Sequence, residues 1–269
     1  MVRIKRFIHK LKKLPRRLSA INSHRGLPDQ IFPDDIFLVS YPRSGNTWVR
    51  TIIANYLTEK SSDQYMLSEV FPEIPKDRQL CNFIHRPRFI KSHEPFLQGY
   101  PQVIYLVRDC RDVLVSLYHF QLRYQSISTK LGLDAFIYEY LDGKHHKFGD
   151  WGEHVRSWTQ SRQSGMLLIR YEDLLKETER EITRIIIYAG LTPDPERIVT
   201  AVANATFDKM KKNSEQRTLY STLGERDMRI PFVRVGSEGQ WRKELTTETS
   251  NKILEKYRNY MTLLGYHQK

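Results

Sequence analysis

The sequence has few cysteines and no long hydrophobic run. Only Cys81 and Cys110 occur among 269 residues, and they lie far apart, which argues against both a disulfide framework and a thiolate metal site. No stretch of about 18 apolar residues is present, as a membrane-spanning helix requires. Lys and Arg interrupt the apolar residues near the N-terminus too often for a signal peptide. We therefore expect a soluble protein of the reducing cytoplasm.

Acidic residues are absent from the first 28 positions, where nine Lys and Arg residues lie. Subtracting these nine from the formal net charge of +12 leaves only +3 for the remaining chain. The basicity thus belongs to an N-terminal arm, residues 1–30, and argues against a specific nucleic-acid partner for a domain at 31–269. Apolar residues at near-helical spacing within residues 1–18 are typical of an amphipathic helix. Such a helix either contacts an anionic membrane surface peripherally or packs on its own domain.

The apolar pattern predicts a single α/β domain, and the chain is hydrophobic enough to bury a large core. Short runs typical of buried parallel strands lie at residues 36–40, 89–90, 103–107 and 166–169. Helical spacing lies between or after them at residues 47–57, 111–123, 151–160, 174–188, 195–204 and 247–264. This alternation predicts three layers, with a mostly parallel central sheet flanked by helices. Residues 211–240 show little periodicity, which indicates a functional loop or partial disorder.

The loop between the first strand and the first helix contains groups that bind anions. A helix N-terminus presents unpaired backbone N–H groups and a partial positive charge. The residues that add donors, a cation or close backbone approach are Arg43, Ser44, Gly45, Asn46 and Thr47. The loop is P-loop-like but lacks the G-x-x-x-x-G-K-[ST] pattern. A simple strand-to-helix turn and a metal-dependent nucleotide kinase therefore remain alternatives.

Several segments resemble, in order, the motifs of one enzyme family. Residues 40–48 closely resemble the 5′-phosphosulfate-binding loop of cytosolic-type sulfotransferases. Residues 91–95 are similar to the catalytic-histidine segment of that family, and residues 107–120 resemble its 3′-phosphate-binding strand and helix. Similarity continues at residues 171–174, 205–213 and 232–241, so that it covers about residues 33–245. Several motifs in the correct order are much more specific than one alone.

The resemblance implies an enzyme that moves a sulfonate from 3′-phosphoadenosine 5′-phosphosulfate to a hydroxyl or amine, without a metal. At the 5′ end of the donor, the resemblance implies contacts with Arg43, Ser44, Gly45, Asn46 and Thr47. At the 3′-phosphate, it implies contacts with Arg108, Ser116, Arg234 and Gly236. At the adenine, it implies contacts with Trp48, Tyr171 and Phe207. The implied catalytic residues are His93, Arg43 and Lys91. A neutral imidazole removes the acceptor proton, and the two cations stabilise charge that develops on the departing oxygen.

Three departures from the family pattern affect these expectations. Arg43 stands where many members have Lys. The sequence does not determine whether its planar guanidinium reaches the bridging oxygen of the donor. Val235 replaces a lysine, so donor binding is weakened or another base such as Lys243 substitutes. Residues 242–251 match the dimer motif of the family poorly, which leaves the oligomeric state undetermined.

The acceptor is not predictable from the sequence, because acceptor pockets are built from variable loops, here residues 61–87, 121–150 and 211–230. A small molecule, a lipid and a glycan all remain possible. His145, His146 and His154 lack the spacing of a zinc-binding helix, and we interpret them as surface or acceptor-pocket residues. A membrane- or RNA-binding module that uses residues 1–18 is the alternative without enzymatic activity.

Overall fold

The computed structural model describes residues 26–61, 66–161, 165–218, 227 and 229–266. Positions 1–25 of the predicted basic arm, and with them the whole predicted helix within residues 1–18, lie outside the described residues. Within the described ranges, no helix combines the length and the apolar character needed to cross a membrane.

The centre of the fold is a four-stranded parallel sheet. Its strands are β1 (Ile36–Ser40), β2 (Phe89–Ser92), β3 (Gln102–Val107) and β4 (Leu167–Arg170). Their order across the sheet is β2-β1-β3-β4, and all neighbouring pairs are parallel. The strands are short apolar runs because both faces of such a sheet are covered. The predicted parallel sheet is therefore confirmed.

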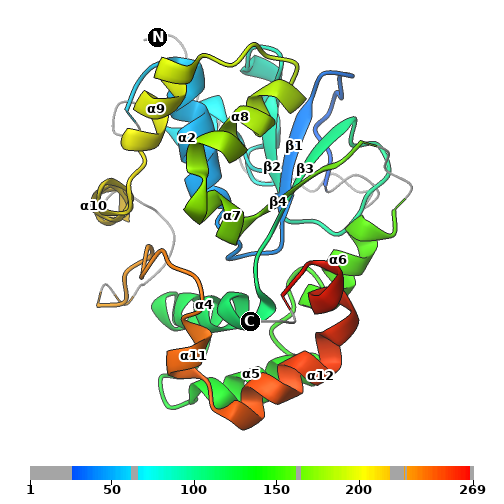
Figure 1. Cartoon of the computed structure of the whole chain (residues 1–269), viewed down its shortest axis with the longest axis vertical. Helices are drawn as coiled ribbons and strands as arrows, with labels where there is room; N and C mark the ends of the chain where they lie inside the picture. Colours follow the sequence, from blue (N-terminus) through cyan, green and yellow to red (C-terminus); the bar gives the residue numbers. More distant parts are fainter. Residues whose placement is uncertain (1–25, 62–65, 162–164, 219–226, 228, 267–269) are drawn as a thin grey trace, which may run out of the picture.

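Helices cover both faces of this sheet, so the molecule has three layers (Figure 1). Alternate residues of β1 face opposite cores: Phe37 and Val39 belong to one apolar cluster, Ile36 and Leu38 to the other. The second cluster contains side chains of α2 (Asn46–Thr58), α8 (Thr178–Tyr188) and α9 (Pro195–Ala203). The first contains side chains of α4 (Cys110–Arg123), α5 (Leu133–Leu141), α6 (Trp151–Thr159) and α12 (Thr247–Leu263).

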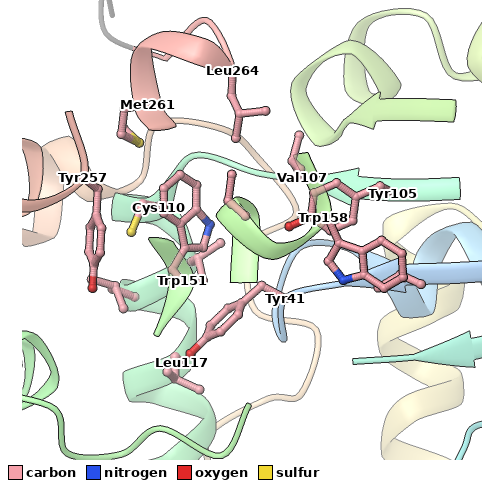
Figure 2. Close-up of a cluster of buried hydrophobic side chains, with 14 of the residues drawn as sticks. Tyr41, Tyr105, Val107, Cys110, Leu117, Trp151, Trp158, Tyr257, Met261 and Leu264 are labelled. Atoms are coloured by element: carbon pink, nitrogen blue, oxygen red, sulfur yellow. The ribbon is translucent and has the colours of Figure 1, made fainter. Parts of the chain in front are cut away.

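Aromatic side chains dominate the core between α4, α6 and α12 (Figure 2). Trp151 at the start of α6 packs edge-on against Tyr257 of α12, with ring centroids 5.6 Å apart. Cys110 at the start of α4 lies in the same cluster and is fully buried. Burial raises the pKa of the Cys110 thiol well above its ordinary value. Both Cys110 and Cys81 are free and buried, so neither is a reactive surface thiol.

Several helices differ from those predicted. The single helix expected at 174–188 is wrong: α7 (Tyr171–Lys176) and α8 are separated at Glu177, whose φ of −135° is not helical. The break allows Leu174 and the isoleucines of α8 to pack on the same face of the sheet. Residues 211–240 are not uniformly a loop, because α10 (Phe207–Thr218) extends into them. The expected acceptor loops contain α5, α3 (Leu67–Val70) and a 3₁₀ helix (Arg78–Phe83), and α11 (Trp241–Glu244) follows.

Candidate active site

The predicted site segments meet at the carboxyl edge of the sheet. β1 ends at Ser40 before the anion-binding loop, β2 ends directly before His93, and β3 ends directly before Arg108. From β1 the chain adds β2 on one side and then β3 on the other, so the strand order reverses between β1 and β3. The helices after β1 and β3 accordingly lie on opposite faces of the sheet. Ligands of open α/β sheets bind at such a switch point.

The anion-binding loop is shaped by two residues in the left-handed backbone region. Arg43 has a φ of 73° and Gly45 a φ of 96°. A side chain at Gly45 would bring its Cβ to 2.5 Å from the ring of Tyr171, so only glycine fits there. The hydroxyl of Ser44 is buried and has no hydrogen-bond partner among the described residues. α2 begins directly after this loop, and the exposed N–H groups of its first turn make the loop suitable for an anion.

His93 is held in one orientation by the main chain. Its Nδ1 lies 2.7 Å from the carbonyl oxygen of Ser40. Since a carbonyl only accepts, Nδ1 carries the proton of the neutral ring and Nε2 carries the lone pair. Burial, reinforced by the charge of Lys91, lowers the pKa of His93 well below its ordinary value. A neutral imidazole with a free lone pair can act as a general base.

Lys91 is buried against a carboxylate that sequence reasoning missed. Its Nζ lies 3.0 Å from Oε2 of Glu73, which is also 4.0 Å from Arg50. Burial lowers the pKa of Lys91 to about 8, although Glu73 opposes this shift. Burial alone would raise the pKa of Glu73. The positive charges of Lys91, His93 and Arg50 outweigh burial and lower this pKa to about 2. Glu73 lies in an expected acceptor loop, and only a main-chain bridge to Lys91 makes it a neighbour.

Arg108 and Arg43 gather on the other side of β1. Arg108 donates to the carbonyl oxygens of Arg43 (3.3 Å) and Ser237 (3.0 Å), and its guanidinium lies over the ring of Tyr171. Arg43 donates through Nε to Ser116 Oγ at 3.1 Å. Nε of Arg108 is buried without a partner in the described part of the chain. Two segments distant in sequence thus bring guanidinium donors to one point, and a third contributes the accepting carbonyl oxygen of Ser237.

The three predicted adenine contacts lie beside this cluster. The rings of Trp48 and Tyr171 are edge to face, with centroids 6.1 Å apart. Phe207 packs so closely on Gly236 that a Cβ there would lie 2.5 Å from its ring. Trp48 also donates to the carbonyl oxygen of Ala205, two residues before Phe207. Trp48 is partly exposed, Phe207 is exposed and Tyr171 is buried. Aromatic faces can stack on a base.

Arg234 was predicted at the 3′-phosphate, but among the described residues no hydrogen bond joins its side chain to Arg43, Arg108 or Ser116. Its guanidinium donates to Glu244 and Gln240, both at 2.7 Å. The other carboxylate oxygen of Glu244 lies 2.7 Å from Nε2 of His119. Nearby, the carboxylate of Asp112 accepts from the backbone N–H groups of Gly239 and Trp241, and so ties this loop to α4. Glu244 and Asp112 were not predicted, because their partners are distant in sequence or belong to the main chain.

His145, His146 and His154 have structural partners. His154 is fully buried, with Nδ1 2.9 Å from the hydroxyl of Tyr105, so its interpretation as a surface residue is wrong. His145 pairs with Glu139, and His146 bonds to a carbonyl oxygen. Among the described residues, no group of three or more His, Cys, Asp or Glu residues is arranged to hold a metal ion.

The comparison with protein families decides the identity. The family model of the sulfotransferase domain matches residues 33–265. The chain belongs to the sulfotransferase domain family. The sulfotransferase is 30% identical to Sulfotransferase 1E1 of Rattus norvegicus over 250 residues, covering 85% of this chain and 84% of the relative. It is 31% identical to Cytosolic sulfotransferase 1 of Danio rerio over 255 residues, covering 86% and 84%. The nucleotide kinase alternative is therefore not favoured.

Solved structures share the fold of this sulfotransferase. A retinol dehydratase in a complex with retinol and PAP superposes with a TM-score of 0.72 at 21% identity, over 86% of this chain and 82% of that chain. A mouse sulfotransferase complexed with PAP has a TM-score of 0.67 at 22% identity, over 86% and 85%. At these identities the likeness establishes the fold.

The sulfotransferase transfers a sulfonate from 3′-phosphoadenosine 5′-phosphosulfate to an acceptor. Its residues fit a ligand with two separate anionic groups. One anion-binding element is the start of α2, with the unpaired hydroxyl of Ser44. The other is the pair Arg43 and Arg108, where an unpaired Nε remains. Gly45 approaches Tyr171 closely, so the ring of Tyr171 lies directly beside the loop.

Proposed function

We propose that the enzyme sulfonates a hydroxyl or amine of a small acceptor, with His93 as the general base. The observation that carries this proposal is the fixed imidazole at the edge of the sheet. Its Nδ1 is bonded to Ser40, the last residue of the strand that leads into the anion-binding loop. The base and the loop are therefore positioned by the same strand.

In this mechanism, Nε2 of His93 takes the proton of the acceptor as the acceptor attacks. When bound, 3′-phosphoadenosine 5′-phosphosulfate supplies the activated sulfonate. Lys91, buried two residues before the base, stabilises the negative charge that develops on the departing oxygen. The backbone of residues 44–47 holds the 5′ end of the donor, and Arg108 and Ser116 hold its 3′-phosphate. Trp48, Tyr171 and Phe207 enclose the adenine.

For the acceptor we propose a small apolar alcohol or phenol that contains rings. The ring of Phe148 lies beside His93, with centroids 5.6 Å apart, and an aromatic face next to the base favours a flat apolar ligand. Structures with the same fold support this class: one retinol dehydratase structure contains androsterone and another contains retinol. The name of the Danio rerio relative also supports a cytosolic location. Transfer of labelled sulfonate to phenols, sterols, glycans and acyl-chain lipids without rings tests this class, and transfer to glycans or acyl-chain lipids alone contradicts it.

The donor proposal predicts discrimination between adenosine 3′,5′-bisphosphate and AMP. Arg108 contacts only the extra phosphate, and a charge-assisted bond contributes about 1.5–3 kcal/mol. We expect the bisphosphate to bind about 10–100-fold more tightly than AMP by calorimetry. Replacement of Arg108 with Met should reduce this difference, whereas replacement of the exposed Arg180, which pairs with Glu177 on the surface, should not. Equal affinity of the unmodified enzyme for both nucleotides would overturn the proposal.

The pH profile should reflect the depressed pKa of Lys91. A lysine with a pKa of about 8 is cationic below that pH and neutral above it. We expect kcat/KM for the donor, which reports the free enzyme, to fall about tenfold per pH unit above about pH 8. Since the pKa of His93 is also lowered, its acidic limb should lie below pH 6.5. In Glu73→Gln the alkaline limb should move to lower pH, because the stabilising carboxylate charge is lost. A limb near the ordinary lysine value of 10.5 would contradict this assignment.

Glu244 is expected to weaken donor binding. Its ion pair with Arg234 must open before this guanidinium can reach a phosphate. A partly exposed pair contributes at most about 1 kcal/mol, so Glu244→Gln should raise affinity for adenosine 3′,5′-bisphosphate up to about fivefold. Affinity for AMP should stay unchanged, as should both affinities in the surface variant Glu177→Gln. Unchanged or weaker bisphosphate binding in Glu244→Gln would show that the ion pair positions Arg234 correctly.

A further inference from the structure

Arg43 points away from the base. Its left-handed backbone directs the side chain toward α4, where Nε donates to Ser116 Oγ at 3.1 Å. A second guanidinium nitrogen donates to the carbonyl oxygen of Phe232 at 3.2 Å. The same guanidinium lies over two neighbouring rings, 4.8 Å from the centroid of Phe120 and 5.0 Å from that of Phe232. Four groups therefore hold one orientation of this side chain.

The topology of the sheet separates this position from the reacting end. β2, which ends directly before His93, and β3, which ends directly before Arg108, lie on opposite sides of β1. Ser116 belongs to the helix that follows β3. Arg43 therefore reaches across toward the β3 side, whereas Lys91 is bound by Glu73 on the β2 side. The two cations do not share one target.

The surroundings of Arg43 favour binding of an anion. Among the described residues no carboxylate forms an ion pair with its guanidinium, and its hydrogen bonds lead to a hydroxyl and a carbonyl oxygen. Burial, together with the positive charges of Arg108 and Arg234, lowers the pKa of Arg43 to about 10. The group remains cationic at neutral pH. The positive charges of Arg43 and Arg108 therefore repel each other, and no carboxylate among the described residues pairs with Arg43 to offset this repulsion. An anionic ligand relieves this repulsion.

We propose that Arg43 binds the 3′-phosphate of the donor, together with Arg108 and Ser116, and that Lys91 is the cation at the reacting end. This inference rests on the proposed function. It also explains the position of Val235, which is exposed and uncharged: Arg43 supplies the charge that this position does not. The planar guanidinium suits this role, since it can bind a phosphate through two parallel hydrogen bonds while it stays packed against the two rings.

The experiment compares the binding of three nucleotides by calorimetry: adenosine 3′,5′-bisphosphate, adenosine 3′-phosphate and AMP. Arg43→Met should weaken binding of the two ligands with a 3′-phosphate by about 10–100-fold, and change the affinity for AMP less than twofold. Arg43→Lys should show an intermediate loss, because it retains the charge but not the planar fork. The surface variant Arg180→Met should bind all three ligands like the unmodified enzyme.

Two results would overturn the inference. Arg43→Met weakens AMP and the bisphosphate by the same factor if Arg43 contacts the 5′ end. A fall in kcat with unchanged affinity for all three nucleotides would place Arg43 at the reacting oxygen. Thermal unfolding of each variant identifies loss of folding, in which case Arg43→Lys carries the test. Failure of the proposed function has a separate outcome, in which the unmodified enzyme does not discriminate between bisphosphate and AMP.

Discussion

His93→Ala should lower kcat by about 10²–10⁴-fold, the usual contribution of a general base. The imidazole contacts Ser40 through Nδ1, and the proposed donor contacts lie on other residues. Affinity for adenosine 3′,5′-bisphosphate should therefore remain within about twofold, which calorimetry measures. A loss of turnover without a loss of nucleotide binding is the signature of a group that acts on the acceptor.

The matched control is His85→Ala, because His85 is exposed on the segment before β2. This variant should keep full turnover and full nucleotide affinity. If His93→Ala loses binding and turnover together, with a lower unfolding temperature, then His93 has a structural role. If His93→Ala keeps more than about one tenth of the activity, another group removes the proton.

Lys91→Met should lower kcat by about 10²–10³-fold, comparable with the loss of one donor to a developing oxyanion. Met has a similar length and lacks the charge, so the packing around the aliphatic stem is largely retained. Because the cation acts on charge that is greatest in the transition state, kcat should fall more than donor affinity. Rapid-quench measurement of sulfonate transfer at saturating donor isolates this step.

Removal of the ammonium group also leaves Glu73 with Arg50 as its remaining cationic partner, at 4.0 Å. A partly buried carboxylate that loses a cationic partner destabilises the fold, so Lys91→Met should unfold at a somewhat lower temperature. The double variant Lys91→Met with Glu73→Gln should recover stability but not turnover. Recovery of turnover in the double variant, or a kcat within threefold of the unmodified enzyme in Lys91→Met, would remove Lys91 from the mechanism.

The strands and the position of the site were predictable from the sequence because they follow from local patterns. Continuous apolar runs such as Ile36–Ser40 predict strands buried on both faces, and the structure confirms the parallel sheet. A parallel sheet places the ends of β1, β2 and β3 at one edge, so the loop, His93 and Arg108 meet there. Their roles remain predictions that the binding and kinetic experiments test.

What could not be predicted depends on contacts between distant segments. A main-chain bridge outside the strands brings Glu73 beside Lys91, where the two side chains form an ion pair. No local sequence pattern predicts this contact. Arg234 is joined to Glu244 across a loop with little periodicity. By contrast, α5 carried a visible signal, since Phe136, Ile137 and Tyr140 follow helical spacing and are all buried. The break at Glu177 has no comparable signal, because the surrounding sequence is helical on both sides.

The bond between His93 Nδ1 and the main chain has a consequence for the catalytic cycle. This nitrogen is tied to Ser40, and the carbonyl oxygen of His93 is itself 3.2 Å from Nε2 of His154. Only the outer nitrogen of the ring can therefore exchange a proton. In the proposed mechanism, a proton captured at Nε2 therefore also leaves from Nε2. The lowered pKa of the ring favours its release and so the return of the neutral imidazole.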